Sequence, residues 1–258
     1  MNPLRLRTLR IFPVTMSLLL VAGCDWPGKP DPAERPVPAD KVLDFAVLYE
    51  KNCSGCHGAD GKLGPAPPLN DPLFLAIVPD AQLSLVIEKG RPGTPMPTFA
   101  REQGGPLTDA QVKALAEGIK PRWGKRPEPA TEQAPPYLAS GTGDAERGKK
   151  VFQRACAVCH GERGEGIEKD GRLRRRINDP AFLALISDQA LRRLAITGRP
   201  DLDMPSYADP RSAGQHFKPL TSTEVSDLVA LLSSWAPERP GRGMGKEGKP
   251  AGPATGDK

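Results

Sequence analysis

Aromatic residues are scarce in this chain, at 5% of 258 residues, whereas prolines and glycines are plentiful, at 30 and 27. This composition means that much of the chain cannot be regular structure. Apolar residues still make up 38%, so compact folding is possible, and the length is sufficient for two small domains. A cofactor that brings its own apolar bulk would help such domains to form a core.

The N-terminal apolar run is too short to span a membrane. It extends from Ile11 to Ala22 and follows a segment with three arginines between residues 5 and 10. A basic segment, a short apolar segment and small residues, in this order, are typical of a signal peptide. We predict a signal peptide over residues 1–23.

Cysteine is also rare, with five residues, and the first stands directly after the apolar run. The segment Leu20-Val21-Ala22-Gly23-Cys24 resembles the lipobox of bacterial lipoproteins, in which cleavage precedes the cysteine and the cysteine is then lipidated. The resemblance implies a membrane anchor with more than one acyl chain at Cys24, on the periplasmic face of a bacterial membrane. The alternative is an ordinary secretory signal with an incidental cysteine.

The mature chain is less basic than its composition suggests. The formal net charge is +5 and the pI is about 9.0. Loss of the three arginines with the signal peptide would lower the net charge to +2. The composition therefore gives no argument for a nucleic-acid partner.

An internal repeat dominates the rest of the sequence. Residues 70–77 match residues 178–185 at an offset of 108. A Gly-Arg-Pro and a Met-Pro recur at the same offset, and a Cys-x-x-Cys-His-Gly recurs upstream at an offset of 103. The matched segments occur in the same order in both copies, which indicates a duplication.

Proline-rich stretches set the expected boundaries. We predict a stiff, extended tether over 24–39, a first domain over 40–123, a linker over 124–142 and a second domain over 143–239. Residues 240–258 are mostly Gly, Pro and Lys, so we expect a disordered tail.

Both domains are predicted to be all-α, because neither shows an alternating strand pattern or a hairpin turn. Apolar residues recur at helical spacing before the first cysteine pair, and short helices are expected at 80–88 and 188–197. The last helix of each domain begins with a capping box. The residues that carry these expectations are Val42, Phe45, Ala46 and Tyr49 in the first helix, and Thr108–Gln111 and Thr221–Glu224 in the capping boxes.

Each copy of Cys-x-x-Cys-His can bind one haem covalently. Two thiols add to the haem vinyl groups, and the adjacent histidine places its imidazole against the iron. The residues are Cys53, Cys56 and His57 in the first copy and Cys156, Cys159 and His160 in the second. A thioredoxin-like redox pair and a single zinc site shared by both copies are the alternatives. The zinc site would leave the matched methionines unexplained.

The iron of an electron carrier needs a sixth ligand, for which methionine is typical. Met96 lies 39 residues beyond His57, and Met204 lies 44 residues beyond His160. Each is followed by proline, which keeps the segment extended. The alternative for each methionine is core filling. His216 could replace Met204 or sense pH, although an exposed loop histidine is the simpler interpretation.

Each half resembles a class I cytochrome c domain. The shared features are an aromatic residue four positions before the first cysteine (Tyr49, Phe152), the Cys-x-x-Cys-His-Gly block, the Met-Pro and a last helix that ends near tryptophan. The resemblance implies an all-α fold with crossing terminal helices and one exposed haem edge. It also makes His57 with Met96, and His160 with Met204, the axial pairs of two haem c groups.

The halves depart from the family in two places. The family often has a glycine where the first helix crosses the last; Gly148 fits, but the matching residue in the first half is Phe45. The family also uses a proline carbonyl to orient the proximal histidine. The first half offers Pro65, Pro67 and Pro68, whereas the second half has no proline there and must use another carbonyl.

Saturated His/Met ligation leaves no open iron position, so we expect an electron carrier and not an enzyme. Its partners would be an oxidase, a quinol-oxidising complex or a dehydrogenase. The alternatives are a subunit of a periplasmic dehydrogenase, a diheme peroxidase, a thiosulfate-oxidising cytochrome, and a sensory or structural haem module.

A run of arginines in the second half predicts a basic rim beside its haem. Such a rim would steer an acidic partner or pair with haem propionates. The alternative is an ordinary solvated face. The residues are Arg172, Arg174, Arg175 and Arg176, with Arg192 and Arg193 nearby.

Overall fold

The computed structural model describes residues 31, 35–124, 133–169, 172–174, 176–209 and 218–237, with the backbone alone for residues 169 and 172–174. The predicted signal peptide, Cys24, His216 and the predicted tail lie outside these residues. Residues 1–39 and 40–258 form two separate units, and everything below concerns the second. No helix in the described part of the chain is both long and apolar enough to cross a membrane.

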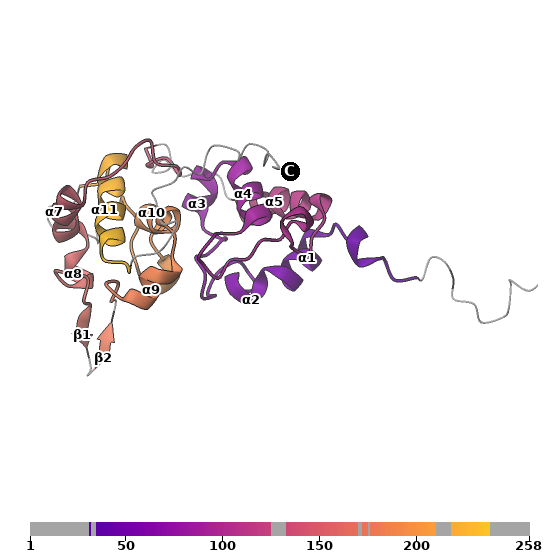
Figure 1. Cartoon of the computed structure of the whole chain (residues 1–258), viewed down its shortest axis with the longest axis horizontal. Coiled ribbons are helices and arrows are strands. Elements are labelled where there is room, and N and C mark those ends of the chain that lie inside the picture. The colour runs from indigo at the N-terminus through magenta and orange to yellow at the C-terminus, as the bar shows by residue number, and fades with distance from the viewer. Residues whose placement is uncertain are drawn as a thin grey trace, which may run out of the picture. The chain divides into compact units, whose positions relative to one another are not determined.

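Helices follow the same order in both halves of the chain (Figure 1). After a 3-10 turn at Ala39–Lys41, the first half contains α1 (Phe45–Asn52), α2 (Ser54–His57), α3 (Pro72–Ile77), α4 (Asp80–Lys89), η4 (Arg101–Gln103) and α5 (Asp109–Trp123). The second half contains α7 (Ala145–Ala155), α8 (Ala157–His160), α9 (Pro180–Leu185), α10 (Asp188–Thr197), η5 (Pro200–Leu202) and α11 (Ser222–Ser234). The all-α prediction is confirmed.

Local sequence explains where these helices begin. The Thr108 and Thr221 side chains each accept a hydrogen bond from the backbone N–H three residues on, so both predicted capping boxes are present. The helices α3 and α9 begin alike, because Asp71 and Asp179 cap them and a proline follows each aspartate.

The first helix is shorter than its spacing predicted. Asp44 caps α1, so Val42 lies outside the helix. Ala46 is exposed, and the buried face of α1 consists of Leu48 and Tyr49 instead. The reason is that the cap, and not the apolar spacing, determines where the helix starts.

One short antiparallel ladder corrects the expectation that the chain has no strands. Strand β1 (Ile167–Lys169) pairs with β2 (Arg172–Arg174), with Lys169 opposite Arg172. The ladder lies where the repeat offset changes from 103 to 108, so the extra residues of the second half fall in this region. Three-residue strands are too short to show a reliable alternation, but the Asp170-Gly171 pair between them is a hairpin signal in the sequence.

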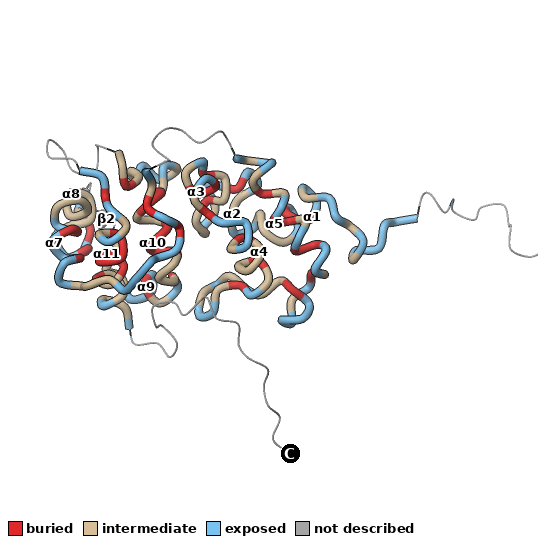
Figure 2. The backbone as a smooth tube through the Cα atoms, turned by 90° about the horizontal axis from the view of Figure 1, so that it is seen from above, coloured by how far each residue is buried: buried red, intermediate tan, exposed pale blue. Residues whose placement is uncertain are grey.

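Three apolar clusters form the cores of the described structure, and Figure 2 shows buried segments in both halves. The first half packs around residues such as Leu48, Phe74 and Leu115. In the second half, Phe152, Ile196 and Val225 belong to one cluster, and Leu183 centres another. Tyr137, from the predicted linker, is 3% exposed and belongs to the first-half cluster.

The terminal helices cross in both halves, but the close approach is made differently. In the second half Gly148 of α7 lies against α11, where an added Cβ would stand 2.1 Å from the Asp227 carbonyl oxygen. In the first half the small residue is Gly118 of α5, whose added Cβ would stand 2.3 Å from the Phe45 ring. Phe45 thus occupies space that Gly118 leaves free.

Candidate haem sites in the two halves

Each Cys-x-x-Cys-His motif forms a single helical turn. The backbone N–H of His57 donates to the Cys53 carbonyl over 2.9 Å, and that of His160 donates to the Cys156 carbonyl over 3.0 Å. This winding brings both thiols and the imidazole of a motif onto one turn of chain. The structure therefore assembles each predicted triplet of residues locally, in the same way in both halves.

The four cysteines that the structure describes are free thiols. Burial raises the pKa of Cys53 to about 11, and that of Cys156 to about 12, with a further increase from the second cysteine of each motif. A reactive redox cysteine needs a lowered pKa instead. Neither Cys53 nor Cys156 therefore has the pKa of a redox nucleophile.

The His57 ring is held by one of the three candidate prolines. Its Nδ1 lies 3.0 Å from the carbonyl oxygen of Pro67, which can only accept, so Nδ1 carries the proton and Nε2 is left to bind a metal. Burial lowers the pKa of His57 to about 4, the hydrogen bond to Pro67 opposes this, and the charges of Arg193 and Arg91 lower it further. A neutral ring is the form that a metal ligand requires.

The residue that follows the first motif is also held in place. The Tyr49 hydroxyl donates to the Gly58 carbonyl over 2.8 Å, and its ring makes an edge contact with Trp123 at 4.9 Å between centroids. In the second half Phe152 makes a similar edge contact with Trp235, at 5.3 Å, without a hydroxyl. The ring contact joins the helix before each motif to the end of the last helix.

The methionine loops are built alike. The backbone N–H of Arg91 donates to the Met96 carbonyl over 3.0 Å, and that of Arg199 donates to the Met204 carbonyl over 3.0 Å. Both methionines are half-buried. These contacts hold each methionine within its own loop. The pairing of Met96 with His57, and of Met204 with His160, stays a prediction, as does the carbonyl that orients the His160 ring.

The donor set of each half fits a haem c group. In each half two thiols can form the thioethers and a methionine thioether sulfur is available in a separate loop. In the first half the neutral His57 imidazole, held through Nδ1, can bind the iron through Nε2. A shared zinc site is not assembled, because the described residues hold no group of three or more His, Cys, Asp or Glu that could bind a metal ion.

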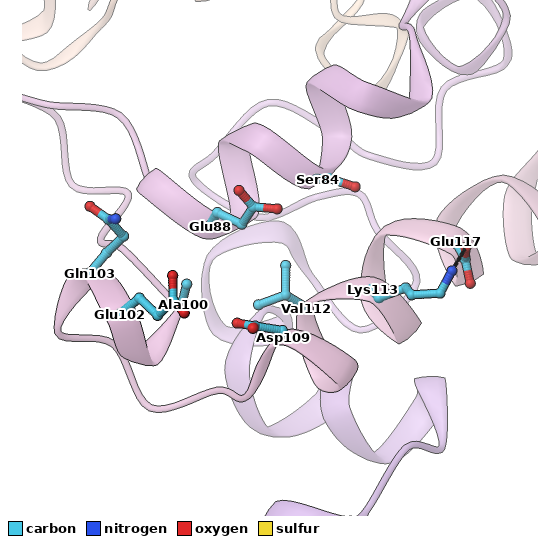
Figure 3. A pocket seen from close by; sticks show the side chains of 9 residues that line it. All are labelled: Ser84, Glu88, Ala100, Glu102, Gln103, Asp109, Val112, Lys113 and Glu117. Atoms are coloured by element: carbon cyan, nitrogen blue, oxygen red, sulfur yellow. Dashed lines mark hydrogen bonds and ion pairs between the residues drawn. The ribbon is translucent and has the colours of Figure 1, made fainter. Parts of the chain in front are cut away.

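An open groove of about 510 Å³ lies elsewhere in the first half, between α4, η4 and α5 (Figure 3). Its polar lining is mainly acidic, and the Lys113 ammonium lies 2.6 Å from the Glu117 carboxylate. None of the predicted haem ligands lines it, so it is not the predicted haem site. The lining residues are Ser84, Glu88, Ala100, Glu102, Gln103, Asp109, Val112, Lys113 and Glu117.

Two arginines of the predicted basic rim are buried, which corrects that prediction for them. Arg192 is 2% exposed and Arg193 is 6% exposed. The sequence could not show this, because arginine is almost never fully buried unless it is paired. Both residues lie on α10, and their partners come from distant parts of the chain. The side chains of Arg172, Arg174 and Arg175 lie outside the described structure, so the rest of the rim stays a prediction.

Comparison with known proteins identifies both halves. Residues 40–117 match the family model described as cytochrome c oxidase, cbb3-type, subunit III, and residues 145–236 match the model described as cytochrome c. The chain therefore carries two cytochrome c domains in tandem, which match the class I cytochrome c family. Two such domains imply haem c as the cofactor.

The curated relatives are subunits of an oxidase. One is the cbb3-type cytochrome c oxidase subunit CcoP of Azospirillum sp. (strain B510), which is 28% identical over 48% of this chain and 43% of its own length. Another is the subunit FixPc of Rhizobium leguminosarum bv. viciae, which is 32% identical over 50% of this chain and 42% of its own length. The chain thus spans less than half of these relatives.

A solved structure also shows similarity to the chain. It is the Kuenenia stuttgartiensis reducing HAO-like protein complex Kustc0457/Kustc0458, with a TM-score of 0.42 and 20% identity over 79% of this chain and all of that chain.

Proposed function

We propose that the protein is a diheme c-type cytochrome that transfers electrons between respiratory partners. The first haem is bound by Cys53 and Cys56, with His57 and Met96 as axial ligands. The second is bound by Cys156 and Cys159, with His160 and Met204 as axial ligands. With both axial positions filled, neither iron offers a site for substrate, and the protein acts as a carrier.

The observation that carries this proposal is the first motif, where two free thiols and a neutral histidine share one turn of helix. The Pro67 carbonyl fixes the ring so that Nε2 stays available. The second motif repeats the turn, with the Cys159 N–H donating to the Cys156 carbonyl over 3.1 Å. A haem bound there would supply a one-electron couple, and the protein residues would set its orientation and exposure.

Mass spectrometry of the denatured protein tests the covalent attachment. We expect a mass increase of two haems over the mature polypeptide, falling to one haem in Cys53→Ala/Cys56→Ala and to one in Cys156→Ala/Cys159→Ala. A denatured wild-type protein without bound porphyrin would reject the proposal.

The reduced spectrum tests the axial ligands. We expect two six-coordinate, low-spin haems that do not bind carbon monoxide. Met96→His and Met204→His should each lower the reduction potential of one haem and leave the other unchanged. A high-spin haem in the native protein would instead favour the diheme enzymes, such as a peroxidase or a thiosulfate-oxidising cytochrome.

We further propose that Cys24 carries the lipid anchor and that the carrier works on the periplasmic face of a bacterial membrane. The lipobox-like segment before Cys24 supports this. Cys24→Ser should move the haem protein from the membrane fraction to the soluble fraction. An unchanged distribution would reject the anchor without affecting the haem assignment.

The partner class follows from the curated relatives. Because they are subunits of cbb3-type oxidases, we propose a membrane oxidase as the electron acceptor. A quinol-oxidising complex or a dehydrogenase would be the donor. Stopped-flow oxidation of the reduced protein by a purified cbb3-type oxidase tests this choice, and a rate no higher than that of a non-cognate cytochrome would reject it.

A further inference from the structure

Arg193 joins the second half of the molecule to the first. Its guanidinium carbon lies 3.4 Å from the centroid of the Phe74 ring, which is the geometry of a cation–π contact. One Nη also donates to the carbonyl oxygen of Pro68. Arg193 lies on α10 of the second half, whereas both contacts lie in the first half, and all three residues are buried.

The contact falls beside the group that orients His57. Pro68 directly follows Pro67, whose carbonyl accepts the hydrogen bond from the His57 ring. The Arg193 side chain of the second half is therefore hydrogen-bonded to the residue that directly follows Pro67, whose carbonyl orients His57.

The first half has no arginine at the positions that correspond to Arg192 and Arg193. At the offset of 108, Ser84 and Leu85 of the first half correspond to Arg192 and Arg193. Arg192 has a different role, because its hydrogen bonds reach the Pro136 carbonyl over 2.8 Å and Ser222 over 2.9 Å. Of the two arginines that are buried in the described part of the chain, only Arg193 forms a hydrogen bond with Pro68.

The burial of Arg193 is costly for stability. Its Nε is buried and has no hydrogen-bond partner among the described residues. A buried cation with an unsatisfied donor stabilises a fold poorly, and an apolar side chain of similar size often does as well or better. Packing alone therefore does not account for an arginine at this position.

We propose that Arg193 is a positioning residue for the first haem: it holds the Pro67–Pro68 segment that orients His57, and its fixed charge raises the reduction potential of that haem. This inference rests on the proposed function, since it requires a haem at Cys53, Cys56 and His57. Reduction adds one electron and so removes one positive charge from the iron site. A cation nearby favours the reduced state, and more strongly when it is buried than when it is in water.

Spectroelectrochemical titration of the intact diheme protein tests the inference. The wave that moves in Met96→His identifies the first haem. We expect Arg193→Gln to lower the equilibrium constant for reduction of the first haem by about tenfold, which is about 59 mV for a one-electron couple. The second haem should stay unchanged. Arg193→Lys keeps the charge and should retain most of the wild-type potential.

Arg192→Gln is the matched control, since it makes the same substitution at the adjacent buried position. Arg192→Gln should leave the reduction potential of the first haem unchanged. Arg193→Leu, which inserts the residue of the first half, provides a second neutral variant should the glutamine variant not fold. The inference is overturned if the neutral Arg193 variants leave the first wave in place, if both waves shift equally, or if Arg192→Gln shifts the first wave as much.

The titration also separates this inference from the proposed function. If the denatured protein lacks haem, or if neither wave moves in Met96→His, the assignment of the first haem and its ligands has failed. If both tests succeed and the neutral Arg193 variants titrate like the wild type, only the role of Arg193 is rejected.

Discussion

At the scale of single residues, the carboxylate of Asp227 shows how a buried charge is satisfied. Its side chain is 3% exposed. It accepts hydrogen bonds from the Asp144 backbone N–H over 2.7 Å and from Arg147 over 2.8 and 2.9 Å. Burial by itself would raise the pKa of Asp227, but the hydrogen bonds and the charge of Arg147 lower it overall. The ionised form is therefore favoured in the folded state.

This lowered pKa gives stability a defined pH dependence. The contribution of Asp227 is fully present above its ordinary pKa of 3.8 and is lost as the pH falls through the lower value of the folded state. We expect Asp227→Asn to cost about 2 kcal/mol of unfolding free energy at pH 7, and the difference from the wild type to shrink below about pH 4. Denaturant titrations at several pH values measure this. Asp144→Asn is the control and should cost only a few tenths of a kcal/mol, because asparagine also caps helices.

Single residues were predictable where chemistry fixes their spacing. The two thiols and the histidine must share one helical turn, and the structure places Cys53, Cys56 and His57 on such a turn. Their role in binding haem stays a prediction. The choice of Pro67 among three prolines was not predictable, because it depends on how the loop returns to the ring. The buried contacts of Arg193 were not predictable, because its partners lie 119 and 125 residues away in the sequence.

At the scale of elements, the crossing of the terminal helices has two different solutions. In the second half, the space beside Gly148 is filled by backbone, because the Asp227 carbonyl oxygen would stand 2.1 Å from a Cβ. In the first half, the space beside Gly118 is filled by the Phe45 side chain. The backbone carbonyl of Asp227 cannot move away from a Cβ added at Gly148, whereas a substitution at Phe45 can make room for a Cβ added at Gly118.

This difference predicts opposite responses to the same substitution. Gly118→Ala should destabilise the protein by about 1–3 kcal/mol through overpacking. In a Phe45→Gly background, where the ring and the Cβ 3.1 Å away are both absent, the same change should become stabilising by up to about 1 kcal/mol, since alanine is the better helix former. A double-mutant cycle measured by thermal unfolding tests the reversal. Gly148→Ala should destabilise in every background, including Leu231→Ala, and a rescue there would contradict the backbone contact.

Elements were predictable from strong local signals. The capping boxes at Thr108 and Thr221 located the starts of α5 and α11 correctly. The short helices α3 and α9 were not assigned, although the repeat pointed to both segments, because six residues are too few for a periodic pattern. Pro121 also lies inside α5, in its last turn, where the sequence alone would place a boundary.

At the scale of the whole molecule, part of the predicted linker is tightly packed. Tyr137 makes a tilted ring contact with Phe74 at 6.1 Å, and its hydroxyl accepts a hydrogen bond from Arg91 over 2.9 Å. Its carbonyl accepts hydrogen bonds from Gln189 over 2.7 Å and from Arg192 over 3.1 Å. One residue thus contacts both halves.

We expect this contact to make the halves unfold together. Tyr137→Ala should cost about 3 kcal/mol and split one calorimetric transition into two, because the ring and its hydrogen bond are lost. Leu138→Ala is the matched control, since the neighbouring side chain is 39% exposed, and it should change little. Two transitions already present in the wild type would contradict the coupling.

The two solutions to the helix crossing also bear on how the duplicated gene can change. Tandem gene copies are prone to unequal recombination. One possible product is a single domain that joins the first helix of the first copy to the last helix of the second copy. Such a product would set Phe45 of α1 against Leu231 of α11, at the positions where each natural pair has one glycine. Two bulky side chains would then occupy space for one, and the shortened protein would fold poorly. The divergence of the halves thus disfavours a fused copy that combines α1 with α11.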